Sequence, residues 1–178
     1  MNMFSRFFYI LFSLKLNNIP LMFSFLPPFL YYLTLSHVDA RNVVSYSDGP
    51  FENSTGVPYF YMSALDPTPK DLAIIPYASL TVSEAPLGTC GLRDVEDPTC
   101  AKITLSGQIH LLDKDAQALE FAALALFSKH PEMKDWPKDH NFNFFALKIQ
   151  DIFLIDWYGG AQVLSVDDYL ANIQHSSI

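Results

Sequence analysis

The sequence has few cysteines, few cations and none of the common enzyme motifs. Only two of its 178 residues are cysteine, and 11 lysines and arginines face 19 aspartates and glutamates. Two cysteines are too few ligands for a metal site, and the five histidines stand singly without the spacing of metal ligands. The sequence therefore predicts no metal site. It contains no Gly-x-Ser-x-Gly, no Walker loop and no Gly-x-Gly-x-x-Gly. No catalytic residues are therefore predicted.

The acidic residues all lie beyond the first 36 residues of the chain. Arg6 and Lys15 are the only charged residues among the first 36, which leaves 9 cations against all 19 acids and a net charge of −10 for the rest. Nucleic acid phosphates would be repelled over most of such a surface. The sequence therefore predicts that nucleic acid is not a partner.

Residues 1–40 form a hydrophobic leader, and residues 41–178 form the folded domain. The leader is open to three interpretations. It is a signal peptide cleaved after the small-residue pattern at residues 38–40, a retained membrane anchor interrupted by Pro27 and Pro28, or a wrongly assigned start of translation. A membrane contact is predicted only through this leader.

Beyond the leader, alternating side chains predict an antiparallel sheet. Residues 77–84 place Ala78, Leu80 and Val82 on one face, and residues 101–111 repeat the alternation, so we expect the two strands to be neighbours. The other predicted strands cover residues 43–46, 57–65 and 142–160, of which the last is an aromatic strand pair or one bent strand. Residues 66–72, with two prolines, predict a turn-rich crossing.

The longest predicted helix covers residues 113–129, which are rich in alanine and leucine. His130 before Pro131 ends it, because a residue that precedes proline resists the helical conformation. Ser165 and Asp168 form a capping box for a short C-terminal helix. Strands separated by turns, with one long helix and one short one, predict an α+β fold built on a small antiparallel β-barrel.

Two features would suit an exported protein. Cys90 and Cys100 flank a turn-rich loop, and a disulfide across it is predicted if the chain leaves the cytosol. Asn53 begins the sequence Asn-Ser-Thr, an N-glycosylation acceptor that has meaning only in the secretory pathway.

Residues 130–137, "HPEMKDWP", are crowded with titratable groups between two prolines. Glu132 and Asp135 form a possible carboxylate pair for catalysis, but a solvated face with Lys134 as counter-ion is the simpler interpretation. Pro131, Met133, Trp136 and Pro137 then make a structural strap, in which Met133 and Trp136 pin the loop to the barrel. His130 is predicted to cap the C-terminus of the preceding helix.

The segments "VVSYSDGP", "GVPYFYMSALDPTPKDL", "PYASLTVSEA", "DPTCAKITLSGQI", "FSKHPEMKDWPKDHNFNFFALKI" and "IFLIDWYGGAQVLSVDDYL" occur in this order across residues 42–170. Together they resemble the CREG glycoproteins (cellular repressor of stimulated genes). The strap residues and the Asp-Trp-Tyr-Gly-Gly at residues 156–160 are the most specific part of the resemblance.

This resemblance implies a flavin-binding-type split barrel, similar to the pyridoxamine phosphate oxidases, in a homodimeric glycoprotein without enzymatic activity. It also implies an extracellular or endolysosomal location, a role in growth and differentiation control, and a cell-surface or sorting receptor as a further partner. A cofactor is not expected. The alternative is an oxidoreductase that binds flavin mononucleotide, and a membrane-anchored form is the alternative for location.

The sequence departs from the family pattern in two places. The aromatic leader stands where family members have a first helix and a first barrel strand, so the domain is expected to lack both. Lys148 stands where a second sequon is often found, so glycosylation depends on Asn53. A flavin phosphate needs arginine or lysine on adjoining strands, and the predicted sheet offers only Lys102 near such a site.

Overall fold

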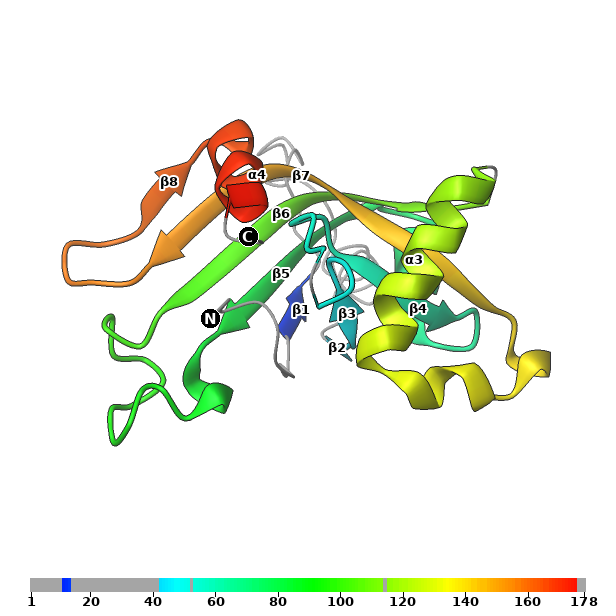
Figure 1. Cartoon of the computed structure of the whole chain (residues 1–178), viewed down its shortest axis with the longest axis horizontal. Helices are drawn as coiled ribbons and strands as arrows, with labels where there is room; N and C mark the ends of the chain where they lie inside the picture. The colour runs from blue at the N-terminus through cyan, green and yellow to red at the C-terminus, as the bar shows by residue number, and fades with distance from the viewer. Residues whose placement is uncertain (1–10, 14–41, 52, 114, 176–178) are drawn as a thin grey trace, which may run out of the picture.

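A curled antiparallel sheet forms the body of the protein (Figure 1). This computed structural model describes residues 11–13, 42–51, 53–113 and 115–175. The strands are β1 (Leu11–Ser13), β2 (Asn42–Val43), β3 (Tyr46–Ser47), β4 (Tyr59–Ser63), β5 (Tyr77–Ser83), β6 (Lys102–Leu111), β7 (Phe142–Ile155) and β8 (Gln162–Leu164). The helices are α2 (Pro67–Leu72), α3 (Ala116–Lys129) and α4 (Val166–His175), with 3-10 turns η2 (Ala85–Leu87), η3 (Pro131–Asp135) and η4 (Lys138–His140).

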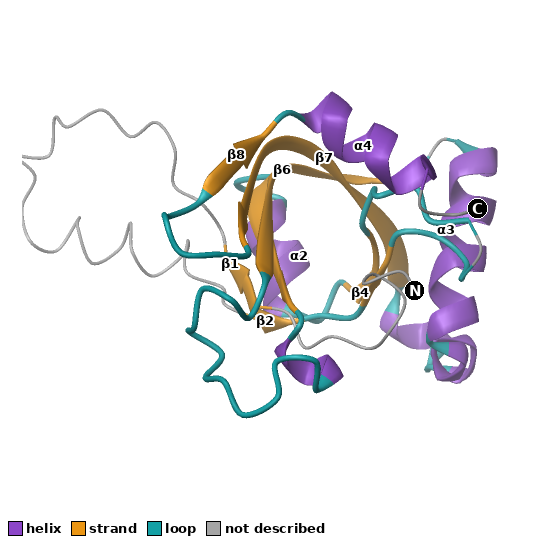
Figure 2. Ribbon diagram, turned by 60° about the vertical axis from the view of Figure 1, so that its left-hand side comes forward, coloured by secondary structure: helices purple, strands orange, loops and turns teal. Residues whose placement is uncertain are grey.

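The long strand β7 organises the sheet. The strand order is β2-β1-β5-β6-β7-β4-β3. β8 pairs with the end of β7, at Ile152–Leu154, whereas β4 pairs with its start, at Phe142–Ala146. β6 pairs with β7 from Lys102 opposite Ile155 to Leu111 opposite Phe145. One edge of β7 thus bonds β6, and its other edge bonds first β4 and then β8. Figure 2 shows the sheet curled upon itself, with α3 and α4 outside it.

The predicted pair of neighbouring strands is confirmed. Leu80 of β5 lies opposite Leu105 of β6, and both side chains are buried. In β5 the apolar residues Ala78, Leu80 and Val82 alternate with the polar residues Ser79, Thr81 and Ser83, so period-two patterning turns the apolar face inward. That face meets Phe60, Leu147 and Ile152 in the main core. The predicted α+β fold with an antiparallel barrel is confirmed as well.

The two predicted helices are present. Asp115 caps α3, because its carboxylate accepts the backbone N–H groups of Gln117 and Ala118 at 3.0 and 3.1 Å. Ser165 opens α4 by accepting the N–H of Asp168 at 3.1 Å, which is the predicted capping box. α4 then places Tyr169 and Ile173 in the main core.

The prediction of a turn-rich crossing at residues 66–72 is wrong, because Pro67–Leu72 form the helix α2. Asp66 caps this helix, and Pro67 occupies its first turn, where a missing N–H costs nothing. The strand predicted at residues 43–46 is interrupted, because β2 ends at Val43 and β3 begins at Tyr46. For residues 142–160, one long strand ends at Ile155, and the turn with Gly159 and Gly160 leads into β8.

β1 comes from within the predicted leader and pairs with β2 and β5. The sequence predicts that the domain lacks a first strand, and in the structure Leu11–Ser13 of the leader form a short strand of the sheet. The other residues of the leader, on which the signal-peptide, anchor and start-site interpretations rest, lie outside the described residues. Among the residues that are described, no helix is both long enough and apolar enough to cross a bilayer.

Candidate functional site

A cavity of about 440 Å³ lies between β4, the start of α2 and the strap. Its aromatic wall consists of Tyr61, Trp136, His140 and Phe142. Its polar side chains are Ser45, Ser63 and Asp66, and aliphatic residues and methionines complete the lining. The volume is in the range of small-molecule sites, and the lining combines apolar residues with polar groups.

Tyr61 lies at the centre of an aromatic cluster. Its ring centroid is 4.9 Å from that of Phe142 and 6.1 Å from that of Trp136, and both pairs are stacked. Trp136 and Phe142 are 5.0 Å apart. Burial raises the pKa of the Tyr61 hydroxyl above its ordinary value, because ionisation is disfavoured away from water. The cluster joins β4, β7 and the strap through contacts between faces of rings.

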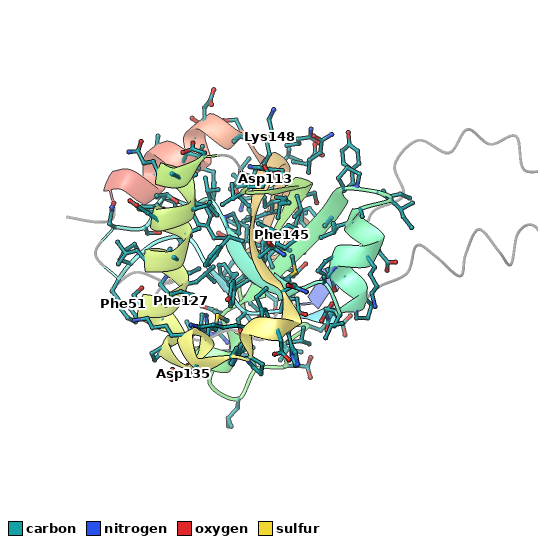
Figure 3. All side chains as sticks on the ribbon, turned by 90° about the vertical axis from the view of Figure 1, so that its right-hand side faces the viewer. Phe51, Asp113, Phe127, Asp135, Phe145 and Lys148 are labelled. Carbon is teal, nitrogen blue, oxygen red and sulfur yellow. A yellow bond between two sulfur atoms is a disulfide. The ribbon has the colours of Figure 1, made fainter. Side chains whose placement is uncertain are left out.

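The strap makes the contacts that its structural interpretation expects. Met133 is almost fully buried, and Trp136 is half-buried in the aromatic cluster, whereas Pro131 and Pro137 are exposed. Figure 3 shows Asp135 of the strap on the same side of the molecule as Phe127 of α3, with Lys148 of β7 at the opposite end. Pro131 begins η3 directly after α3 ends, so the chain turns under the helix end and returns to β7.

The charged residues of the strap point away from this wall. Glu132 and Asp135 are exposed, in keeping with a solvated face. Lys134 lies over the ring of Phe127, with its ammonium 6.0 Å from the ring centroid. This contact is a cation–π interaction of the kind worth about 0.5–1 kcal/mol at exposed sites.

His130 connects the end of α3 to the sheet. It is the C-cap residue, and its N–H donates to the Leu126 carbonyl oxygen at 2.8 Å. Its imidazole Nε2 lies 3.1 Å from the carbonyl oxygen of Tyr46 on β3. The predicted capping position is therefore confirmed, and the ring in addition bonds to a strand far away in the sequence.

The cavity does not fit a flavin phosphate. Among the described residues that line it there is no lysine or arginine, and the one acidic side chain, Asp66, would repel an anion. Lys102, the candidate from the sequence, is engaged elsewhere: its ammonium donates to the carbonyl oxygens of Val95, Glu96 and Asp97 at 3.0, 3.1 and 3.3 Å. Phosphate recognition through paired cations is thus not supported at this site.

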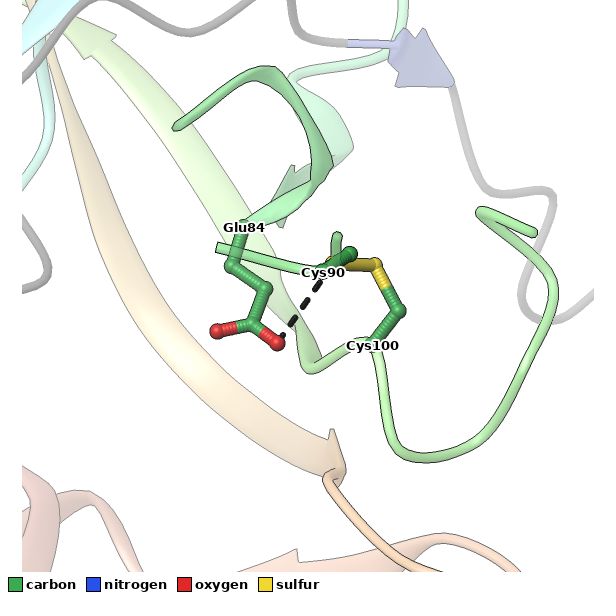
Figure 4. A group of neighbouring side chains, drawn as sticks. All are labelled: Glu84, Cys90 and Cys100. Atoms are coloured by element: carbon green, nitrogen blue, oxygen red, sulfur yellow. Dashed lines mark hydrogen bonds between the residues drawn. A yellow bond between two sulfur atoms is a disulfide. The ribbon is translucent and has the colours of Figure 1, made fainter. Parts of the chain in front are cut away.

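Cys90 and Cys100 form the predicted disulfide in the β5–β6 loop. Figure 4 shows Glu84 beside it, with Oε1 3.5 Å from the sulfur of Cys90. The same Oε1 accepts the N–H of Ala101 at 2.9 Å. These three side chains come close enough together to hold a metal ion, but sulfurs joined in a disulfide are not thiolate ligands. The group therefore serves to close the loop.

Arg93, although exposed, also binds the backbone of this loop. Its guanidinium donates to the carbonyl oxygens of Cys90, Thr99 and Thr89 at 2.8, 2.9 and 3.2 Å. Lys102 donates to further carbonyl oxygens of the loop from the other side. The two cations thus satisfy backbone groups that would otherwise depend on solvent.

The sequon lies in the loop after β3. Asn53 is exposed, and the loop is closed by Thr55, whose N–H and hydroxyl both donate to the Asp48 carbonyl oxygen, at 2.8 and 2.6 Å. A Cβ on Gly49 would lie 2.0 Å from the Asn53 carbonyl oxygen, so the loop requires glycine there. A glycan on the Asn53 side chain would project into solvent without disturbing this closure.

Sequence reasoning did not find the cavity. Its carboxylate, Asp66, belongs to a segment predicted as a crossing, and its ring partners Tyr61 and Phe142 were assigned only to strands. The one available signal was Trp136, which the strap interpretation used as an anchor. These residues meet only because β4 pairs with the start of β7, with Tyr61 opposite Phe144.

Several solved structures share the fold. The heme binding protein from Mycobacterium smegmatis matches with a TM-score of 0.58 and 16% identity, over 92% of this chain and 54% of that chain. HutZ, the heme storage protein from Vibrio cholerae, matches with a TM-score of 0.52 and 11% identity, over 86% and 84%. A FAD-binding protein from Mesorhizobium loti gives 0.51 and 10%, over 85% and 87%. At such identities the likeness establishes the split-barrel fold alone.

The sequence itself matches one family. The family described as "CREG, beta-barrel" covers residues 34–171. Human protein CREG2 is 43% identical over 130 residues, which are 72% of this chain and 44% of CREG2. Human protein CREG1 is 38% identical over 141 residues, which are 76% of this chain and 63% of CREG1. The chain thus spans less than two thirds of each relative, and on these matches it belongs to the CREG beta-barrel family.

Proposed function

We propose that this chain is a non-enzymatic, exported glycoprotein that acts by surface recognition in the control of growth and differentiation. It would work as a homodimer, outside the cell or in the endolysosomal system, and bind a cell-surface or sorting receptor. The observation that carries the non-enzymatic part is the lining of its cavity, whose described residues include a carboxylate and no lysine or arginine. A flavin oxidoreductase of this fold would need cations for the cofactor phosphate.

Two features support export. The disulfide between Cys90 and Cys100 is of a kind that persists in oxidising compartments and is rare in the cytosol. Asn53, the acceptor residue of the sequon, is exposed and therefore accessible to glycosylation.

An exposed apolar hairpin supports recognition through the surface. Phe153 of β7 lies directly opposite Val163 of β8, and their side chains are 39% and 85% exposed. Trp157 and Tyr158 at the turn are 65% and 64% exposed. Large exposed aromatic residues that lie together are enriched in protein interfaces.

The deciding experiment is expression of the full chain in a secreting animal cell line. We expect colourless protein in the medium that releases no flavin on denaturation and sediments as a dimer. Yellow protein that releases flavin mononucleotide would overturn the non-enzymatic proposal in favour of the oxidoreductase alternative. Protein that stays in the membrane pellet after alkaline carbonate would replace the exported form by an anchored one.

Glycosylation is tested on the same material. Asn53→Gln should migrate faster on a denaturing gel than the wild-type chain, because the glycan is lost. Treatment of wild-type protein with an N-glycosidase is the matched control and should give the mobility of the variant. Identical mobility of untreated wild-type protein and the variant would show that Asn53 carries no glycan.

A further inference from the structure

We propose that the cavity beside β4 is a binding site for a small organic cation, an ammonium group carried on an apolar or aromatic body. In the cavity wall, Tyr61 stacks on both Phe142 and Trp136, and Asp66 supplies the one carboxylate among the described lining residues. Aromatic faces attract ammonium groups through their quadrupoles, and a carboxylate supplies the opposite formal charge. The inference concerns a ligand of this cavity and is independent of how the protein surface recognises other proteins.

The aromatic wall is fixed before any ligand arrives. Tyr61 contacts not only Trp136 and Phe142 but also Phe127 and Phe144, whose ring centroids lie 5.5 and 4.7 Å away. Phe127 comes from α3, and Phe144 comes from β7, so Tyr61 is held by rings from two further elements. A prearranged wall lowers the ordering cost that a ligand must overcome.

The carboxylate is fixed as well. Asp66 Oδ1 accepts the backbone N–H of Thr68 at 2.7 Å, and the amide of Asn42 donates to Oδ1 and Oδ2, each at 3.0 Å. A carboxylate can accept about four hydrogen bonds, so Oδ2 retains capacity for a ligand N–H or for the charge of a quaternary ammonium. Asp66 is therefore both the cap of α2 and the charged group of the cavity.

Within the described part of the chain, no lysine or arginine side chain lines the cavity. Lys70, on the same helix, is exposed and donates to the Leu65 carbonyl oxygen at 3.0 Å. His140 is the one imidazole in the lining, and its ring stacks on Phe142 with 6.3 Å between the centroids. The formal charge of the lining with a neutral imidazole is thus −1, which favours a monovalent cation.

Other ligand classes fit less well. An anion would meet Asp66 without a compensating cation in the lining. A sugar needs several spare polar groups, but Ser63 already donates to the His140 carbonyl oxygen at 2.7 Å and accepts the N–H of Leu65 at 3.1 Å. An amine on an apolar body uses both the rings and the carboxylate.

The test is a titration of the full chain with three probes of similar size: benzyltrimethylammonium, benzyl alcohol and benzoate. Binding is followed by NMR of the two tryptophan indole N–H groups at about pH 8, where an ordinary imidazole is neutral. We expect a saturable shift of the Trp136 signal with the ammonium probe, and none of the Trp157 signal, since Trp157 lies outside the lining. Benzyl alcohol should bind at least about tenfold more weakly, because it lacks the charge.

Asp66→Asn isolates the charge. Asparagine caps helices as well as aspartate does, so α2 should persist while the affinity for benzyltrimethylammonium falls at least about tenfold. Asp71→Asn is the matched control, because it removes the same charge from the same helix outside the cavity lining. Its affinity should be that of the wild-type chain.

Several outcomes would overturn the proposal. They are equal binding of benzyl alcohol and the ammonium probe, equal weakening by both variants, equal shifts of both tryptophans, or no saturable binding. The comparison of the three probes on wild-type protein decides the question even if Asp66→Asn fails to fold. Flavin in the purified protein would refute the non-enzymatic function instead, so the two failures are distinguishable.

Discussion

The ammonium of Lys129, the last residue of α3, lies 2.9 Å from the carboxylate of Asp48 in the loop after β3. Their side chains are only 11% and 3% exposed. The hydroxyl of Ser54 also donates to this carboxylate. The pair joins the end of the long helix to the loop that carries the sequon, and the surrounding protein shields it from water.

Removal of one partner should therefore be costly. Lys129→Met leaves the Asp48 carboxylate buried without its cation, and the free energy of unfolding should fall by about 3–5 kcal/mol. Urea denaturation followed by circular dichroism measures the change. Lys138→Met, on the exposed turn η4, is the control and should stay within about 0.5 kcal/mol of wild type. Equal effects of the two substitutions would contradict a structural role for the pair.

The protein should lose stability at alkaline pH. Burial raises the pKa of the Tyr46 and Tyr169 hydroxyls well above their ordinary value, with a further increase from the charge of Asp48. An unfolded tyrosine ionises near about pH 10, so above that pH the folded state holds more protons than the unfolded state. Stability is then fully present below about pH 10 and is lost as the pH rises through the folded pKa values.

Single substitutions separate the two tyrosines. Tyr46→Phe should flatten the alkaline decline at little cost near neutrality, because the Tyr46 hydroxyl has no hydrogen-bond partner among the described residues. Tyr169→Phe should flatten it too but cost about 1 kcal/mol at neutral pH, since its hydroxyl donates to the Gly56 carbonyl oxygen. Tyr158→Phe, at an exposed position, should change neither quantity. The measurement is a series of denaturation curves from neutral to strongly alkaline pH. An alkaline loss of stability that is the same in the wild-type chain and in all three variants would contradict the role of the two buried tyrosines.

The two tryptophans differ in their expected contribution to stability. Trp136→Ala should destabilise the fold by about 1–3 kcal/mol, less than for a fully buried aromatic residue, because the ring is half-buried against Tyr61 and Phe142. Trp157→Ala, at a site 65% exposed, should change stability by less than about 0.5 kcal/mol. Thermal unfolding of both variants compares them directly, and an unchanged curve for Trp136→Ala would refute the strap interpretation.

The disulfide should stabilise the β5–β6 loop. Replacement of Cys90 and Cys100 by serine opens a loop with a sequence separation of 10 and should cost about 2–3 kcal/mol. A thiol reductant should produce the same loss in wild-type protein under denaturing conditions that expose the bond, and no loss in the double variant. A denaturation midpoint that does not respond to reductant in the wild-type chain would argue against the bond.

Local patterns predicted much of the fold. Ala78, Leu80 and Val82 alternate so clearly that their strand and its buried face could be identified, and Ser165 with Asp168 marked the start of α4. Residues 66–72 could not be read in this way. Pro67 and Pro69 break most structures but are compatible with a first helical turn, and only the hydrogen bonds of Asp66 decide between the two.

The cavity was beyond sequence reasoning for a different reason. Asp66, Tyr61 and Phe142 are ordinary as a cap, a strand residue and a core aromatic, and their spacing along the chain contains no motif. Their proximity depends on the register between β4 and β7 and on the curl of the sheet. Registers between strands far apart in the sequence depend on the whole packing of the core and cannot be derived from one strand alone.

The pairing of β4 with β7 also governs the order in which the chain can assemble on the ribosome. Tyr59 of β4 pairs with Ala146 of β7. Until the ribosome has synthesised β7, the only described strand that can pair with β4 is therefore the two-residue strand β3. The β5–β6 hairpin, closed by its own disulfide, needs no such wait. Contacts between distant segments slow folding. Between these two events Phe60 and Tyr61 lack their neighbouring strand β7, and unpaired strand edges with exposed apolar side chains make a folding intermediate prone to aggregation.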